Sequence, residues 1–303
     1  MIINRNGYGS NFNEITINNN LLIKKIKNDY GKEKIKNEIN FYNSIKTIDF
    51  PTPTIIEMNI NKYYIIMEYL KEYNPLYKLF NDLDDSSKNE ILNLIKFHLN
   101  KLHKIIIPIK IKLYNDDLIN ETISKIDERM KNVEFIIKKY SFIKKINNKI
   151  FIPFSKIKNE ISKNIYNHIN NNKYYFYSII HGDCQFNNIL INNKDIKFID
   201  PRGYYNNSKV YGLKEYDLAK IDFALSGYDV FDNSIISKLD IDNDNININD
   251  IYLQQNKHLL SKNILINTLT ATIWFGNSHI FKDNEYKCIY SYFMAINFSN
   301  ILF

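Results

Sequence analysis

At 303 residues, with 45% hydrophobic and 24% charged residues, the chain has the composition of a globular protein with one large domain or two lobes. Its two cysteines are too few for a disulfide framework or a cysteine-based zinc site, and we expect neither a signal peptide nor a membrane span, hence a soluble protein in a reducing cytoplasm. The net charge of +7 comes from lysines interleaved with acids, so we expect no nucleic-acid or membrane partner, although the excess is compatible with an anionic ligand.

The first predicted elements are two short strands on either side of a glycine-containing turn. Residues 1–3 and 14–17 are rich in β-formers, and Gly7, Gly9 and Ser10 lie in the turn between them. Backbone N–H groups in such a loop can bind phosphates, which makes these three residues candidate phosphate ligands. A Gly-x-Gly turn is more often only a turn.

A third strand, residues 21–24, ends in Lys24, and apolar periodicity predicts a helix over residues 32–46. The apolar stripe of this helix consists of Ile35, Ile39, Tyr42 and Ile45. Glu38 projects within the stripe, whereas Glu33 projects from the opposite side. Because an unpaired buried charge is costly, we expect Glu38 to pair with Lys24 and Glu33 to be solvated. The alternative is that Glu38 reaches water at the edge of the stripe.

Further elements follow in order along the chain. We expect strands at 54–58 and 63–67, and a helix up to about residue 105 that is capped by Ser86 or Ser87 together with Glu90. Later helices are expected at about 116–145, at 155–171, and as two or three segments within 256–303. Residues 240–250 superficially resemble a calcium loop, but lack its glycine and its final glutamate, so we expect a polar surface loop.

A predicted hairpin brings two polar side chains together. Residues 189–191 and 196–199 are β-formers separated by four turn-type residues. If the hairpin is centred near Lys194, Asn188 lies opposite Asp200, and paired residues have Cβ atoms about 5 Å apart. An amide oxygen and a carboxylate at this open end could bind one hard cation such as Mg²⁺.

Asp183 lies in the loop before that end, and a carboxylate that can accept a hydroxyl proton beside a Mg²⁺ site completes the parts that phosphoryl transfer needs. The pattern His181-x-Asp183-x-x-x-x-Asn188 followed by Ile199-Asp200 resembles the core of the aminoglycoside phosphotransferase and choline kinase family, which has a protein-kinase-like fold. The resemblance implies that Asp183 is the catalytic base and that His181 supports its loop. It also implies that Asn188 and Asp200 are the metal ligands.

The same resemblance extends to the N-terminal residues. Lys24 would pair with the α- and β-phosphates of ATP, held by Glu38, as in the kinase strand and helix. The stretch from Met67 to Leu70 is similar to the hinge between kinase lobes. Backbone groups of Glu68 and Leu70 would then meet the adenine edge, with Met67 at the back of the pocket. ATP and Mg²⁺ are thus the implied cofactors.

Residues 211–220, with Glu215-x-Asp217-Leu-Ala, resemble small-molecule kinases that phosphorylate sugars, including fructosamine and methylthioribose kinases. By that resemblance Asp217 braces the catalytic loop, which is compatible with a helix N-terminal acid. The Leu102-His103 pair is similar to one that packs near this loop in the aminoglycoside phosphotransferase family. A protein kinase is disfavoured by Gln185, where protein kinases carry a lysine.

We therefore predict an α+β, two-lobed, protein-kinase-like fold, with a β-rich nucleotide-binding lobe at 1–70 and a mainly helical catalytic and substrate-binding lobe at 71–303. The predicted function is ATP-dependent transfer of the γ-phosphoryl group to a hydroxyl of a small molecule, a sugar or amino sugar. One alternative is a choline- or ethanolamine-type kinase, whose aromatic box could come from 256–303. Another is a pseudokinase scaffold. A basic RNA-binding protein is the weakest alternative, because no stacking or basic motif supports it.

Overall fold

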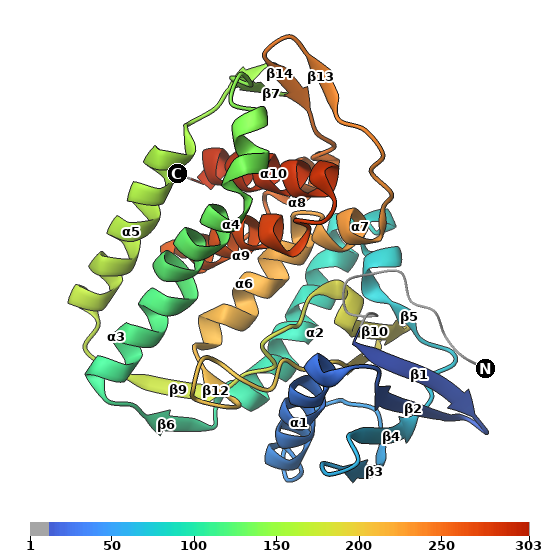
Figure 1. Cartoon of the computed structure of the whole chain (residues 1–303). Coiled ribbons are helices and arrows are strands. Elements are labelled where there is room, and N and C mark those ends of the chain that lie inside the picture. The colour runs from blue at the N-terminus through green and yellow to red at the C-terminus, as the bar shows by residue number, and fades with distance from the viewer. Residues whose placement is uncertain (1–11, 303) are drawn as a thin grey trace. The chain divides into compact units, whose positions relative to one another are not determined.

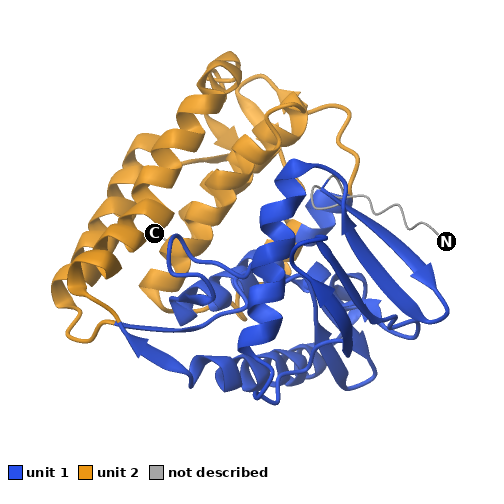
Figure 2. Cartoon of the chain, turned by 60° about the horizontal axis from the view of Figure 1, so that its bottom comes forward, with its two compact units in different colours: residues 1–108, 176–224, 229–233 blue, residues 109–175, 225–228, 234–303 orange. Residues whose placement is uncertain are grey.

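The computed structural model describes residues 12–302, which divide into two compact units (Figures 1 and 2). The first unit comprises residues up to 108 together with 176–224 and 229–233, and the second contains the remainder. Every predicted site residue that the structure describes belongs to the first unit. The boundary between lobes near residue 70 stays a prediction, and Gly7, Gly9 and Ser10 lie outside the described residues.

An antiparallel sheet of four strands begins the first unit, in the order β1-β2-β4-β3. The strands are β1 (Asn13–Asn18), β2 (Leu21–Ile26), β3 (Ile55–Asn59) and β4 (Tyr64–Glu68). The turn between β1 and β2 places Asn19 and Asn20 at φ of +48° and +62°, a left-handed conformation that asparagine tolerates better than most residues. Lys24 lies opposite Ile65, so β4 fixes its place in the sheet.

Helix α1 (Asp29–Ser44) lies between β2 and β3 in the chain and packs against the sheet (Figure 1). The Asn28 side chain accepts a hydrogen bond from the Gly31 N–H, which satisfies one of the free donors of the first turn. The predicted stripe is buried, with Ile35 and Ile39 at 0% and 3% exposure. The helix begins three residues earlier than expected because its cap, and not its apolar stripe, determines its start.

The rest of the first unit, within the described residues, consists of short sheets, three α-helices and short 3-10 helices. The sheets have the orders β11-β10-β5 and β12-β9-β6. The bounds are β5 (Asn74–Pro75), α2 (Asp85–His103), β6 (Ile106–Pro108), β9 (Phe176–Ile179), β10 (Ile189–Asn192), β11 (Asp195–Phe198), β12 (Tyr211–Gly212), α6 (Lys214–Leu225) and α7 (Tyr228–Asn233), the end residues Leu225 and Tyr228 belonging to the second unit.

The expected cap of α2 is wrong. Asp84, and not Ser86 or Ser87, is the N-cap residue, and its carboxylate accepts a hydrogen bond from the Ser87 N–H at 2.8 Å. An aspartate at this position also interacts favourably with the positive end of the helix dipole, which explains why it takes precedence over the serines that follow it.

The hairpin of β10 and β11 is present, but its predicted register is wrong by one residue. Ile191 pairs with Ile196 and Asn192 with Asp195, so the turn contains two residues, with Asn193 at φ +53°. Two-residue turns are the commonest hairpin connections. As a result the Asn188 carbonyl accepts a hydrogen bond from the Ile199 N–H, and Asp200 lies one residue beyond that pair.

The second unit is mainly helical, and its apolar interior is formed by α4, α5, α9 and α10. The bounds are α3 (Ile111–Ile119), a π-helical turn (Asn120–Ser124), α4 (Lys125–Lys139), α5 (Phe154–Asn171), α8 (Ile251–Asn256), α9 (Ile264–Ile280) and α10 (Glu285–Leu302). No helix within residues 12–302 is long and apolar enough to cross a membrane. The helix expected at 116–145 corresponds to α3, the π-helical turn and α4. Together they start earlier and end earlier than predicted.

Two further expectations concern this unit. Residues 240–250 are not wholly irregular, because β13 (Asp240–Asp242) and β14 (Asn245–Asn247) form a hairpin that joins β7 (Lys145–Ile146) and β8 (Lys149–Ile150) in one sheet. The aromatic residues Trp274, Phe275 and Phe293 are at most 2% exposed, so they are core residues and do not line an open aromatic box.

Gly203 fixes the distance between α1 and the segment after the hairpin, and replacing it should destabilise the protein. Its φ is +68°, and a Cβ atom there would lie 2.1 Å from the Asn37 carbonyl oxygen on α1. We expect Gly203→Ala to lower the free energy of unfolding by about 2 kcal/mol or more, measured by urea denaturation. Glu33→Ala, an exposed change on the same helix, should cost less than about 0.5 kcal/mol. Equal effects of the two variants would contradict this packing.

Candidate active site

A buried lysine shared by two carboxylates lies at the centre of the site. Lys24, 6% exposed, contacts Glu38 Oε2 at 2.6 Å and Asp200 Oδ1 at 2.7 Å through its Nζ. Burial acts to lower the pKa of Lys24, but the two carboxylates outweigh it and the net shift is upward. The side chain is therefore held as an ammonium ion between α1 and the residue that follows the hairpin.

The structure places Glu38 and Glu33 as the helical periodicity predicted. Glu38 is 3% exposed and paired with Lys24, whereas Glu33 is exposed. Burial raises the pKa of Glu38; the charge of Lys24 opposes this shift, and the like charge of Asp200 adds to it. Tyr42, one turn further along α1, is buried too, and burial followed by the charge of Glu38 raises its pKa.

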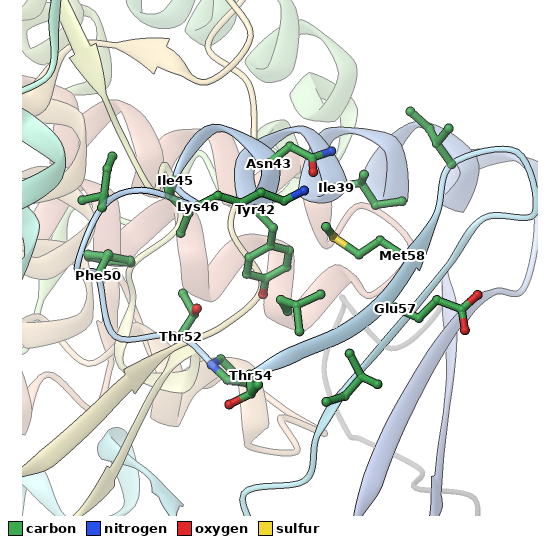
Figure 3. Close-up of a pocket in the computed structure, with 15 residues that line it drawn as sticks. Ile39, Tyr42, Asn43, Ile45, Lys46, Phe50, Thr52, Thr54, Glu57 and Met58 are labelled. Atoms are coloured by element: carbon green, nitrogen blue, oxygen red, sulfur yellow. The ribbon is translucent and has the colours of Figure 1, made fainter.

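Tyr42 also borders a pocket of about 610 Å³ between α1 and the segment leading into β3 (Figure 3). Its walls include Ile39, Phe50, Thr54 and Met58. None of the predicted catalytic, metal-binding or nucleotide-binding residues lines this pocket. It is therefore separate from the site described here, although Tyr42 belongs to the same helix as Glu38.

Asp183 is held at both carboxylate oxygens. The Asn188 amide donates to Asp183 Oδ2 at 3.0 Å and to the Asp183 carbonyl at 2.9 Å. Lys220 contacts the other oxygen, Oδ1, at 2.8 Å. Because both Asn188 bonds use its nitrogen, its side-chain oxygen takes part in neither of them. The Asp183 side chain is 31% exposed, so its carboxylate is accessible while its position is fixed.

His181 is a buried residue that packs beneath the loop. It is fully buried, its ring lies against those of Phe41 and Phe198, and its Nδ1 accepts a hydrogen bond from the Asp183 N–H at 3.3 Å. Burial lowers the pKa of the imidazole, which favours the neutral ring that can accept this bond. The side chain therefore supports the loop that carries Asp183.

Asp217 binds the backbone of the same loop. Its carboxylate accepts hydrogen bonds from the N–H groups of His181 and Gly182 at 3.0 and 2.7 Å, and contacts His103 Nε2 at 2.9 Å. It is completely buried at the start of α6. His103 from α2 thus joins the carboxylate that holds the loop, close to where the Leu102-His103 resemblance placed it.

A second buried carboxylate, Asp229, holds the other end of the loop and was not predicted from the sequence. It accepts hydrogen bonds from the Phe186 and Asn187 N–H groups at 3.0 and 3.1 Å. Burial raises its pKa to about 7. No motif marks this residue, because it lies 42 residues from Asn187 in a short helix without a recognisable pattern.

Two lysines that sequence reasoning missed also act on the site. Lys220 lies three residues after Asp217 on α6 and pairs with Asp183. Lys34 lies one turn before Glu38 on α1, and although burial lowers its pKa overall, the charges of Asp183 and Asp200 oppose that shift. Helical spacing from Asp217 and Glu38 was a signal that could have identified both.

The predicted hinge residues lie at the end of β4. Met67 is 5% exposed. The Glu68 N–H donates to the Thr54 carbonyl at 2.9 Å, so this donor is used within the sheet. Leu70 follows the strand and accepts a hydrogen bond from Tyr73 through its carbonyl.

A strand lysine paired with a helix glutamate, beside a loop and hairpin that carry Asp183, Asn188 and Asp200, is the arrangement of the protein-kinase-like fold. Comparison with solved structures shows this fold for the chain. The resemblance inferred from residues 181–200 is thereby confirmed at the level of fold. No protein-family model and no curated protein matches the sequence.

The similar structures are kinases of small molecules. The ternary complex of APH(2")-IIa with streptomycin and ATP superposes with a TM-score of 0.56 at 15% identity, over 98% of this chain and 90% of that chain. ADP-bound aminoglycoside phosphotransferase APH(2'')-Ib gives 0.55 at 15% identity, over 99% and 93%. Glucosamine kinase gives 0.56 at 10% identity, over 93% of this chain and 74% of that chain.

The raised pKa of Asp229 should make stability depend on pH. The carboxyl binds a proton more tightly in the folded state, at a pKa of about 7, than in the unfolded chain, where 3.8 is the ordinary value. Its contribution to the free energy of unfolding is therefore complete at low pH and decreases as the pH rises through 7. We expect the wild type to lose stability relative to Asp229→Asn between pH 5 and 7, by at most about 1.4 kcal/mol per pH unit.

The measurement is urea denaturation of both proteins from pH 5 to 8, and only the difference between them is used, because all other titrating groups are common to both. A difference that does not change with pH would show that Asp229 titrates near its ordinary value. It would also show that its burial is compensated by the two backbone N–H groups.

Proposed function

We propose that this chain is an ATP-dependent phosphotransferase that transfers the γ-phosphoryl group to a hydroxyl of a small molecule. The observation that carries the proposal is the ion-pair chain Glu38–Lys24–Asp200 in the same unit as the doubly held Asp183. The ion-pair chain would provide the phosphate clamp and a metal ligand, and Asp183 the proton acceptor, which are the parts that phosphoryl transfer requires.

Lys24 is the proposed clamp for the α- and β-phosphates of ATP. Its ammonium already lies between two carboxylates, and Glu38 keeps it in place when phosphate oxygens replace Asp200 as its second partner. Met67 would border the adenine, with the Glu68 carbonyl and the Leu70 N–H as its backbone contacts. Gly7, Gly9 and Ser10 stay candidate phosphate ligands.

Asn188 and Asp200 are the proposed Mg²⁺ ligands, and their chemistry fits that ion. Magnesium prefers oxygen ligands and retains several waters, so two protein oxygens suffice. Asn188 has a side-chain oxygen outside its bonds to Asp183, and Asp200 is held at φ +56°, a conformation that aspartate adopts more readily than most residues. Bound there, Mg²⁺ would neutralise charge on the phosphate oxygens.

Asp183 is the proposed base. As the bond between the γ-phosphorus and ADP breaks, the acceptor oxygen forms a new bond to phosphorus and its proton passes to the Asp183 carboxylate. His181, Asp217 and Asp229 hold the loop so that this carboxylate keeps its position. Because the transition state is largely dissociative, positioning contributes more than basicity.

The proposed acceptor is a polyol of the sugar or amino-sugar class. The kinases of similar fold include a glucosamine kinase. The choline- or ethanolamine-type alternative has less support, because Trp274, Phe275 and Phe293 are core residues. A pseudokinase scaffold is disfavoured because the lysine, the base and both metal ligands are present. ATP, Mg²⁺ and a small hydroxyl compound are the proposed partners.

Replacing the base should abolish transfer. With Mg-ATP and a panel of sugars, sugar acids, sugar phosphates, amino sugars, choline and aminoglycosides, we expect at least one acceptor to raise ADP release, and Asp183→Asn to lower that rate by about 10²–10⁴-fold. Asp195→Asn, an exposed change on the same hairpin, should leave the rate within twofold. If no acceptor raises turnover, and if Asp183→Asn leaves any residual turnover unchanged, the proposed function is wrong.

The two glutamates of α1 provide a matched test of the clamp. Glu38→Gln removes the charge that holds Lys24, so we expect KM for ATP to rise and kcat/KM to fall by about tenfold or more, which corresponds to about 1.4 kcal/mol. Glu33→Gln changes the same charge on the opposite face and should have no effect. The measurement is steady-state kinetics of both variants with varied Mg-ATP. Equal effects of Glu38→Gln and Glu33→Gln would contradict the role of Glu38.

A further inference from the structure

The carboxylate proposed as the base has a cation of its own. Lys220 Nζ lies 2.8 Å from Asp183 Oδ1, and the side chain of Lys220 is only 13% exposed. Burial alone acts to lower the pKa of this lysine, but Asp183 outweighs that effect and the net shift is upward. An ammonium ion is therefore fixed within hydrogen-bonding distance of the group that must meet the acceptor hydroxyl.

A second cation, Arg202, lies two residues after Asp200 and contacts the loop that carries Asp183. Its backbone N–H donates to the His181 carbonyl at 2.9 Å, and its side chain covers Gly182, where a Cβ atom would lie 2.9 Å from Arg202 Cβ. The guanidinium donates to the Tyr216 hydroxyl at 2.9 Å, and its charge acts on Lys220. Lys220, Arg202 and Asp183 together carry a formal charge of +1, from two cations and one carboxylate.

Four other carboxylates near this loop have partners of their own. Asp200 and Glu38 share Lys24, Asp217 holds two backbone N–H groups and His103, and Asp229 holds two further N–H groups. An acceptor with an ammonium group beside its reacting hydroxyl would thus meet Lys220 and would have to compete for carboxylates already in use. The ammonium groups of Lys220 and of such an acceptor would repel each other. Because Lys220 is partly buried, solvent and salt screen this repulsion only weakly.

We propose that the acceptor carries an anionic group, a carboxylate or a phosphate, beside the hydroxyl that is phosphorylated, and that Lys220 binds that group. The ammonium has three donors, of which Asp183 uses one, so it can bind the base and the anion together. This inference rests on the proposed phosphotransferase function and narrows its acceptor from sugars and amino sugars to sugar acids and sugar phosphates.

The test uses acceptors that differ in charge but share one carbon framework. Glucuronate, glucose 6-phosphate, glucose and glucosamine form one set, and the matching galactose compounds form a second. ADP release with saturating Mg-ATP gives kcat/KM for each. We expect the carboxylate or the phosphate compound to exceed the neutral sugar by tenfold or more, and the amino sugar to be the poorest. The two anions separate a carboxylate from a phosphate as the recognised group.

Variants of Lys220 show whether this residue carries the preference. Lys220→Met should reduce the ratio of kcat/KM for anionic over neutral acceptor to about one, through a higher KM for the anion, whereas Lys220→Arg should retain most of the ratio. The ratio is used because any general effect on Asp183 cancels. Lys214→Met removes an exposed charge from the same helix and should leave the ratio unchanged.

The outcomes distinguish the inference from the function on which it rests. Turnover led by the neutral or the amino sugar, or an anion preference that persists in Lys220→Met, overturns the inference and leaves the phosphotransferase intact. Absence of turnover with every acceptor, together with no effect of Asp183→Asn, overturns the proposed function and the inference with it.

Discussion

The buried ammonium of Lys24 is the interaction on which the first unit depends. Its two partners, Glu38 and Asp200, lie 14 and 176 residues away in the sequence. An unpaired charge in the interior is costly, so β2, α1 and the end of the hairpin must keep one arrangement for both carboxylates to reach it. Gly203 enforces that arrangement sterically, because the backbone after Asp200 passes α1 with no room for a side chain.

Around this ion-pair chain, buried carboxylates fix the backbone of the loop that carries Asp183. Asp217 binds the N–H groups at its start and Asp229 those near its end. A carboxylate that accepts backbone hydrogen bonds positions a loop without occupying its reactive face. The loop is therefore rigid at both ends, while the Asp183 carboxylate between them stays partly exposed.

Local physics predicted four strands of the sheet, helix α1 and the buried position of Glu38. The cost of a buried charge called for a cationic partner, and the kinase resemblance supported Lys24 in that role. The hairpin register failed by one residue, since a turn centred on Lys194 assumes an odd number of turn residues and the structure has two. Asp229 was missed for another reason. Its partners are brought near by tertiary folding, and no spacing within its own short helix signals a distant loop.

The two lysines divide the site electrostatically. Lys24 pairs with Asp200, where phosphate and metal are proposed to bind, and Lys220 pairs with Asp183, where the acceptor hydroxyl is proposed to bind. In a dissociative transition state the hydroxyl loses its proton late, so a carboxylate already bonded to Lys220 and Asn188 acts mainly by fixing the oxygen in line. In the proposed complex, the cation that holds this carboxylate also binds the acceptor, which would link positioning of the base to choice of substrate.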